Sequence, residues 1–300
     1  MMKTRKRQKI IPLLALTVIV LTGAILTLTL GSGQEAEEPL PPDPHQGEVQ
    51  VNDGTGEVWI PLEENVNLSL VGKTDFSADE NGWPVYTGDR YLTYRGIDVS
   101  ELQGAINWQK VKAAGIDFAF LRIGFRGYGE SGKLVEDGSF FRNLTDAKAS
   151  GVRVGAYFFS QAVSAEEAEE EAEFVLKTLG ESELDLPVIF DWERVEQEDS
   201  RTREIPTALL DSLGGAFCRC IEESGHQAGI YFSRQLGYYG YDLSTLKDYT
   251  WWVADPGTYP AFYYEAAFWQ YSVDAEVPGI DIIVDMDMWF VPKERKGTPR

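Results

Sequence analysis

The chain has 300 residues, of which 43% are hydrophobic and 12% aromatic, so it can bury a substantial core and is not an intrinsically disordered protein. It carries 48 acidic against 27 basic side chains, a formal net charge of −21, which excludes non-specific binding to nucleic acid because such binding depends on Lys and Arg neutralising phosphates. The two histidines, His45 and His226, and the two closely spaced cysteines argue against a histidine-based metal site, a Ser-His-Asp triad and a disulfide framework.

The first thirty residues have the pattern of a membrane anchor. Residues 1–9 hold five basic side chains, and residues 10–30 form an uncharged stretch about as long as a helix needs to cross a hydrocarbon core of ~30 Å. Residues 31–34 (GSGQ) offer no clear small-x-small cleavage site, which favours an uncleaved signal anchor over a secreted protein with a cleaved signal peptide. The basic flank predicts a cytoplasmic amino terminus for the segment 1–30 and an extracellular position for the rest of the chain.

Three further segments precede or follow the main domain. Residues 31–50 are acidic and rich in proline, which predicts an extended linker. Residues 51–90 carry scattered aromatic residues among Gly, Asn and Asp, which predicts short strands packed as an extension whose role the sequence does not indicate. We expect the main domain at 91–293, followed by a short tail at 294–300.

The main domain alternates apolar runs with amphipathic segments in β-α order. We expect strands at 92–99, 118–125, 152–160, 186–193, 228–233, 250–254, 267–272 and 282–290, and helices at 108–114, 140–149, 165–179 and 207–223. Because the strands are apolar on both faces, they predict a parallel sheet, closed as an irregular TIM-barrel-like α/β barrel of about eight strands. The connections 234–249, 255–266 and 273–281 are poor helix formers, so we expect helices to be missing from the second half.

Carboxylates stand where such a barrel places its active site, at the carboxyl ends of the strands. Asp98 ends the first strand, Asp191 and Glu193 end the fourth, and Asp285 and Asp287 lie on the last. Residues i and i+2 of a strand share a face, so each pair is expected to project the same way. Crowded carboxyl groups raise one another's pKa, which keeps one protonated as a general acid while others stay ionised. Cleavage of a glycosidic bond needs this combination.

Other interpretations of these acids stay open at this point. Carboxylates at strand ends often cap helices or pair with arginines, here Arg122 and Arg194. A magnesium site built from carboxylates is the main chemical competitor, but the sequence has no Gly/Lys phosphate-binding loop to accompany it.

Aromatic residues near the same strand ends are candidates for stacking on sugar rings. They are Tyr157, Tyr231, Trp252 and Trp269. The alternative for each is core packing, and of the adjacent Trp251 and Trp252 one must belong to the core.

A series of motifs runs in order between residues 94 and 290. They are GIDVSELQGAINW (96–108), FAFLRIG (118–124), GAYFFS (155–160), DWE (191–193), GIY (229–231), WVA (252–254), WQY (269–271) and VDMD (284–287). This series resembles the glycoside hydrolase family 25 lysozymes, also called Chalaropsis-type muramidases. The resemblance implies an irregular α/β barrel that cleaves the β-1,4 bond between N-acetylmuramic acid and N-acetylglucosamine in peptidoglycan, without a metal or cofactor and with retention of configuration.

The resemblance also implies roles for individual residues. Glu193 matches the general acid, Asp191 matches the neighbour that orients the substrate's N-acetyl group, and Asp98 and Asp285 complete the acidic site. The expected substrate-binding residues are Tyr157, Tyr231, Trp252, Trp269, Asp287 and Gln103. The expected partners are peptidoglycan glycan strands and, through residues 10–30, the cytoplasmic membrane, with the protein a monomer.

Two positions depart from the family pattern. Phe158 stands where the family often has His, and Asp287 where it often has Asn. Asp287 is expected to add negative charge that raises the pKa of Glu193 or Asp285 and shifts the pH optimum. Two alternative functions remain, a catalytically silent peptidoglycan-binding module and a chitinase-like glycosidase.

Overall fold

The computed structural model describes residues 44–293, which belong to one compact unit. The expected membrane span at 10–30, most of the linker and the tail at 294–300 lie outside the described residues. Within residues 44–293, no helix combines the length and the apolar character needed to cross a membrane.

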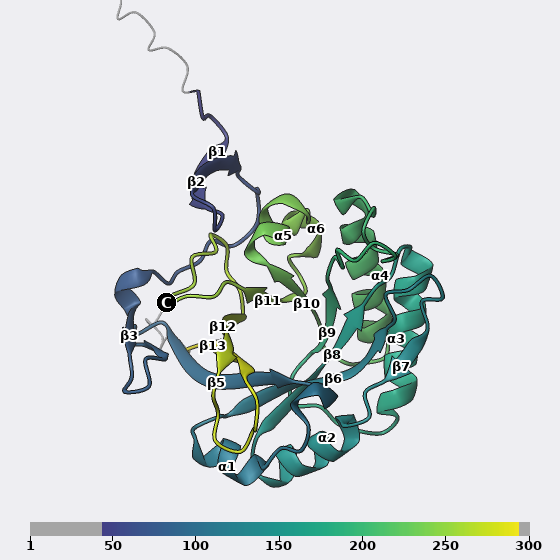
Figure 1. Cartoon of the computed structure of the whole chain (residues 1–300). Coiled ribbons are helices and arrows are strands. Elements are labelled where there is room, and N and C mark those ends of the chain that lie inside the picture. The colour runs from purple at the N-terminus through teal and green to yellow at the C-terminus, as the bar shows by residue number, and fades with distance from the viewer. Residues whose placement is uncertain (1–43, 294–300) are drawn as a thin grey trace, which may run out of the picture. The chain divides into compact units, whose positions relative to one another are not determined.

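A sheet closed on itself forms the centre of this unit (Figure 1). In spatial order its strands are β5 (Tyr91–Val99), β13 (Val284–Pro292), β12 (Phe268–Ala275), β11 (Thr250–Ala254), β10 (Ala228–Ser233), β9 (Val188–Trp192), β8 (Arg153–Ser160) and β6 (Phe118–Arg126). Pairing of β5 with β6 closes the barrel, and the short β7 (Leu134–Glu136) is added to β6. The predicted barrel of about eight strands is confirmed.

The direction of the last strand differs from the prediction. The strands from β5 to β12 run parallel to their neighbours in the wall, but β13 is antiparallel to both β12 and β5, so the all-parallel prediction is wrong there. Only residues 276–283 connect β12 to β13, and a parallel crossover needs about a dozen residues or more. The amino end of β13 therefore lies beside the carboxyl ends of the other strands.

Helices cover the barrel unevenly, as predicted. The helices α1 (Trp108–Ala113), α2 (Phe140–Ala149), α3 (Ala165–Leu179) and α4 (Leu210–Glu223) follow β5, β6, β8 and β9. The glycine just beyond each of them, at 115, 151, 180 and 225, adopts a positive φ that terminates the helix. After β10 come only α5 (Arg234–Tyr239) and α6 (Leu243–Leu246), and no described helix follows β11 or β12.

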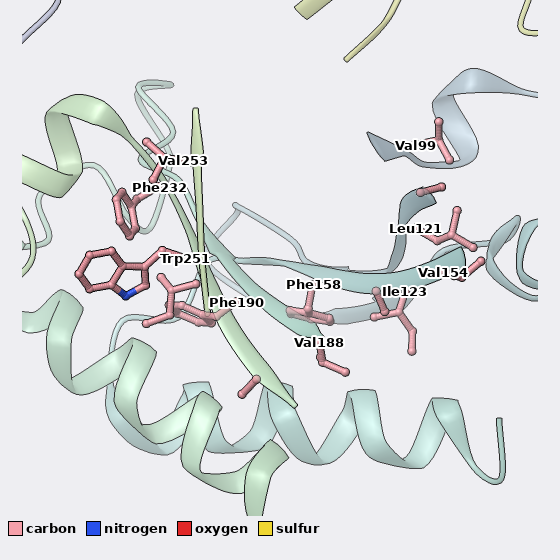
Figure 2. Close-up of a cluster of buried hydrophobic side chains, with 14 of the residues drawn as sticks. Val99, Leu121, Ile123, Val154, Phe158, Val188, Phe190, Phe232, Trp251 and Val253 are labelled. Carbon is pink, nitrogen blue, oxygen red and sulfur yellow. The ribbon is translucent and has the colours of Figure 1, made fainter. Parts of the chain in front are cut away.

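Alternation along the strands divides the apolar side chains into two layers. The outer layer faces the helices, and Figure 2 shows part of it, with labels on Val99, Leu121, Ile123, Val154, Phe158, Val188, Phe190, Phe232, Trp251 and Val253. The inner cluster fills the barrel and consists of the buried residues Phe118, Phe120, Tyr157, Leu186, Ile189, Trp252 and Phe268. Toward the carboxyl ends of the strands, polar side chains can therefore gather inside the barrel beyond this inner cluster.

The extension consists of two hairpins. The strands β1 (Glu48–Asn52) and β2 (Glu57–Pro61) form the first, and β3 (Phe76–Ala78) and β4 (Pro84–Tyr86) form the second. The strand β1 begins at Glu48, so the last residues of the expected linker at 31–50 belong to this first hairpin.

The second hairpin packs on the outside of the barrel where helices are missing. The ring of Phe76 contacts those of Trp269 on β12 and Phe290 on β13, with centroids 5.5 and 6.3 Å apart. Asp79 forms an ion pair of 2.9 Å with Arg95 on β5. The extension thus covers apolar surface that the later strands would otherwise expose.

Candidate active site

Four of the five predicted acids converge at the mouth of the barrel. Asp98 lies near the end of β5, Asp191 near the end of β9, and Glu193 directly after it. Asp285 lies at the start of β13, where the antiparallel register pairs it with Asp98. The charges of these groups act on one another's pKa, so the reversal of β13 brings the fourth acid to the other three.

The pKa values of the four acids are all raised. Burial is the main cause for Asp98 and Asp191, and the charges of Asp285 and Glu193, respectively, act next. Burial raises the pKa of Asp285 to about 6. Displacement of water by the surrounding protein, and then the charge of Asp285, raise the pKa of Glu193, although the residue is exposed at the mouth. The raised pKa values disfavour ionisation of all four groups together and favour retention of protons in the site in mildly acidic solution.

Asp98 is held by a short chain of hydrogen bonds. Gln270 donates from Nε2 to Asp98 Oδ2 at 2.9 Å, and the Tyr231 hydroxyl donates to Gln270 Oε1 at 2.9 Å. Because Tyr231 occupies the oxygen of the amide, the NH₂ group of Gln270 faces Asp98. This bond lowers the pKa of Asp98 and so opposes part of the effect of burial.

Asp287 lies deeper than the other acids and is fully buried. Its Oδ1 accepts a hydrogen bond of 2.8 Å from Trp252 Nε1, and its Oδ2 has no partner among the described residues. Burial, and then the charge of Asp98, raise the pKa of Asp287 well above its ordinary value, which favours the neutral acid. Burial thus opposes the negative charge expected of Asp287, and its expected contact with substrate stays a prediction.

A basic group beside the acids was not among the predicted site residues. Arg122 on β6 lowers the pKa of Asp191 and donates from Nε to Asp137 Oδ2 at 2.9 Å. Asp137 is also fixed by the backbone N–H groups of Glu101 and Ser139, at 2.9 Å each. Arg122 is thus a positioned cation that favours ionisation of Asp191.

The predicted aromatic residues divide between the two layers. Trp252 packs inside the barrel, its ring centroid 4.7 Å from Tyr231 and 6.1 Å from Tyr157, beneath the acids. Trp269 belongs to the outer layer, is 1% exposed, and donates from Nε1 to the carbonyl of Asp255 at 2.7 Å. Trp269 therefore lies on the opposite strand face from the site, which corrects its expected role in sugar binding.

Gln103 also has a different position from the one expected. Its Oε1 accepts hydrogen bonds from the backbone N–H of Ser100 at 2.8 Å and from the Ser100 hydroxyl at 3.1 Å. These bonds close a capping box around the short 3₁₀ turn Glu101–Gln103 after β5. We conclude that Gln103 shapes the loop after Asp98, and its expected contact with substrate stays a prediction.

Sequence reasoning missed Gln270, although strand alternation could have identified it. Phe268 and Gln270 share the inner face of β12, and the prediction took the intervening Trp269 because a large aromatic side chain suits a sugar ring. Arg122 was considered only as an ion-pair partner, and its alternation with Phe118 and Phe120 places it on the inner face of β6.

Comparison with known proteins agrees with this geometry. The family model described as "Glycosyl hydrolases family 25" matches residues 97–280 and so stops short of Asp285. Lysozyme M1 of Streptomyces globisporus is 26% identical over 292 residues, covering 88% of this chain and 86% of that protein. The uncharacterized protein YegX of Escherichia coli K12 is 30% identical over 207 residues, covering 66% of this chain and 70% of that protein.

Solved structures share the fold. The crystal structure of the bacterial lysozyme from Streptomyces coelicolor has a TM-score of 0.52 and 26% sequence identity, covering 65% of this chain and 91% of that chain. The closed barrel, the acids at its mouth and these matches lead to one assignment: the chain belongs to glycosyl hydrolase family 25 and is a glycoside hydrolase of the lysozyme type.

Proposed function

We propose that the protein is a membrane-anchored N-acetylmuramidase that cleaves the β-1,4 bond between N-acetylmuramic acid and N-acetylglucosamine in peptidoglycan, with retention of configuration. The observation that carries the proposal is the position of Glu193, an exposed residue whose carboxyl pKa is raised, beside three acids that are less exposed. A protonated group in reach of substrate, next to groups that stabilise positive charge, is the arrangement that acid-catalysed glycoside cleavage requires.

The first step is assigned to Glu193. Its carboxyl proton passes to the glycosidic oxygen as the bond from that oxygen to the anomeric carbon breaks, and positive charge develops on the sugar ring. Burial and the charge of Glu193 raise the pKa of Asp191, and Arg122 opposes that effect. Within this proposal Arg122 is the cation that holds negative charge on Asp191, which is assigned to stabilise the developing charge or to orient the substrate's acetamido group. Attack by a carboxylate or by the acetamido oxygen, followed by water, gives retention by either route.

Release of reducing sugar from purified peptidoglycan tests this proposal. We expect the full-length protein to release fragments with N-acetylmuramic acid at the reducing end, and Glu193→Gln to lower the rate by about 10³-fold, as for loss of a general acid. Glu196→Gln is the matched control, because Glu196 is an exposed acid of the same loop.

The same assay separates the alternatives. Binding to peptidoglycan with equal, near-zero release by wild type and Glu193→Gln would support a silent binding module. Faster release from chitin than from peptidoglycan would support a chitinase-like glycosidase. N-acetylglucosamine at the new reducing ends would place the cut at the other glycosidic bond and overturn the muramidase assignment.

Membrane anchoring is supported by the sequence pattern of residues 1–30 alone. We expect the protein in the membrane fraction of cells, and we expect deletion of residues 1–30 behind a cleavable signal peptide to release an active soluble form. Mass analysis of the protein from cells distinguishes the two possibilities, since an amino terminus beyond residue 30 would show a secreted, cleaved product.

A further inference from the structure

The loop that follows Glu193 is fastened to the barrel by buried side chains that the reaction itself does not use. We propose that Gln161, closed by Thr202, is a positioning residue that fixes the backbone of Glu193 and thereby the place of its carboxyl group. This inference rests on the proposed role of Glu193 as the general acid.

Glu193 lies just beyond the support of the sheet. The pairing of β8 with β9 ends at Ser160 and Trp192, so no strand partner holds the next residue of either chain segment. Within the described part of the chain, the Glu193 carboxyl group accepts no hydrogen bond and joins no ion pair. Its position therefore depends on how its backbone is held.

Gln161 supplies the missing support. Its amide is fully buried, and Nε2 donates to the carbonyl of Glu193 at 2.6 Å and to the carbonyl of Ser160 at 2.8 Å. One side chain thus joins the ends of the two strands where the backbone ladder stops. Both amide hydrogens are used, so the orientation of the group is determined.

Thr202 completes the hydrogen bonding of this amide from the far end of the loop. Its hydroxyl is fully buried and donates to Gln161 Oε1 at 2.9 Å. The Thr202 hydroxyl oxygen also accepts a hydrogen bond of 3.1 Å from the backbone N–H of Val195. A single hydroxyl therefore links Gln161 to the second residue after Glu193.

Arg194, next to the acid, binds the returning part of the loop. Its guanidinium donates to the carbonyls of Thr202 at 3.0 Å and Ile205 at 2.7 Å, and to that of Arg203. The segment 194–205 is thereby closed on itself at the site where Glu193 leaves the sheet. We call Gln161, Thr202 and Arg194 the clasp.

The expected effect of the clasp is on catalysis more than on binding. A shift of about 1 Å in a reacting group can lower a rate by about 10²-fold, because the acid no longer meets the leaving oxygen in line. Sugar contacts made elsewhere in the groove are not held by the clasp. Loosening it should therefore lower kcat and leave KM nearly unchanged.

The test uses the full-length protein, purified in detergent, and solubilised peptidoglycan. We expect Thr202→Val to lower kcat by about 10-fold to 100-fold with KM within twofold, and Thr202→Ser, which keeps the hydroxyl, to restore most of the rate. Gln161→Met, of similar length without the amide, should resemble Thr202→Val. Asn143→Leu is the stability control, because it removes a buried hydrogen bond that Asn143 of α2 accepts from Trp108 Nε1 of α1.

A second measurement does not need activity. NMR of the Glu193 carboxyl carbon, assigned by the loss of its signal in Glu193→Gln, should show a lower pKa in Thr202→Val. A loosened loop moves the group away from the surrounding protein and the charge of Asp285, which together raise its pKa. Thr202→Ser should titrate as wild type does. An inactive wild type would end the proposed function, and this titration would still decide whether the clasp positions Glu193.

Three results would overturn the inference. They are a kcat loss in Asn143→Leu as large as in Thr202→Val at equal loss of thermal stability, no rescue by Thr202→Ser, and an unchanged Glu193 pKa in Thr202→Val. Failure of Gln161→Met to fold leaves the Thr202 pair of variants to decide the question.

Discussion

The two halves of the barrel wall both carry acids at the mouth, but different elements cover their outer faces. From β5 to β9 the outer face is covered by α1 to α4, whereas β12 and β13 are covered by the extension, with Phe76 and Tyr86 packed against their aromatic side chains. Both halves nevertheless supply acids to one mouth, Asp98, Asp191 and Glu193 from the first and Asp285 from the second. The site depends on the position of the strands, and a strand needs its outer face covered by apolar atoms of any element.

The largest effect is expected where the extension meets the barrel. Trp269→Ala should lower the free energy of unfolding by about 4 kcal/mol, the range for deleting a large buried aromatic side chain, and leave kcat of the folded protein within about threefold. Chemical denaturation and activity below the transition measure the two quantities. An intact stability with a 100-fold higher KM would mean that Trp269 binds sugar after all.

The contribution of the second half to the chemistry is tested by Asp285→Asn. We expect kcat to fall by about 100-fold, as when one preorganised electrostatic group is removed from a site. The charge of Asp285 helps to raise the pKa of Glu193, and activity needs Glu193 protonated, so the alkaline limb of the pH–rate profile should move to lower pH. A limb that stays in place would show that the two acids do not interact, and a limb that moves to higher pH would show that Asp285 lowers the pKa of Glu193.

Two variants compare how much the extension and a covering helix each stabilise the barrel. Phe76→Ala, in the extension, and Leu144→Ala, in α2, should each lower the free energy of unfolding by about 2 kcal/mol, toward the low end for such deletions because Phe76 is half-buried and Leu144 is 7% exposed. Urea titrations of both variants provide the comparison. If Leu144→Ala lowered the free energy of unfolding and Phe76→Ala left it unchanged, the extension would not stabilise the barrel.

The smallest effect is expected at the deepest acid. Because burial favours the neutral form of Asp287, Asp287→Asn replaces one uncharged group by another, and we expect kcat and the pH–rate profile to change by less than about twofold. A shift of the profile by a full pH unit would show that Asp287 is ionised and acts on the acids above it.

Much of the barrel could be predicted because its signals are local. The boundaries of α1 to α4 follow from periodicity and from the glycines beyond their ends, and strand alternation places Asp98 and Asp191 on the inner face. The direction of β13 follows from the short connection between β12 and β13, which can be read from the sequence. The prediction instead followed the general rule that the strands of such a barrel are parallel. The depth of Asp287 could not be predicted, since alternation gives the face of a strand and not the height along the barrel axis.

The role of the extension could not be predicted, because it depends on contacts between segments that are far apart in the sequence. The rings of Phe76 and Trp269 are in contact although the two residues are far apart in the sequence, and no local sequence pattern connects them. The clasp likewise joins Gln161 to Thr202 through a loop without regular spacing. Contacts between distant segments depend on the completed fold, and they account for most of what sequence reasoning left open.

The place of β13 between β12 and β5 has a consequence for the order of assembly. The strand that closes the wall is the last one in the chain, and its partner β5 is the first strand of the barrel, so closure is among the most non-local steps and should be among the slowest. Before it, β5 and β12 present unpaired edges and the mouth lacks Asp285. A chain interrupted before residue 284 would therefore be both inactive and prone to aggregate, which makes completion of the polypeptide a condition for lytic activity.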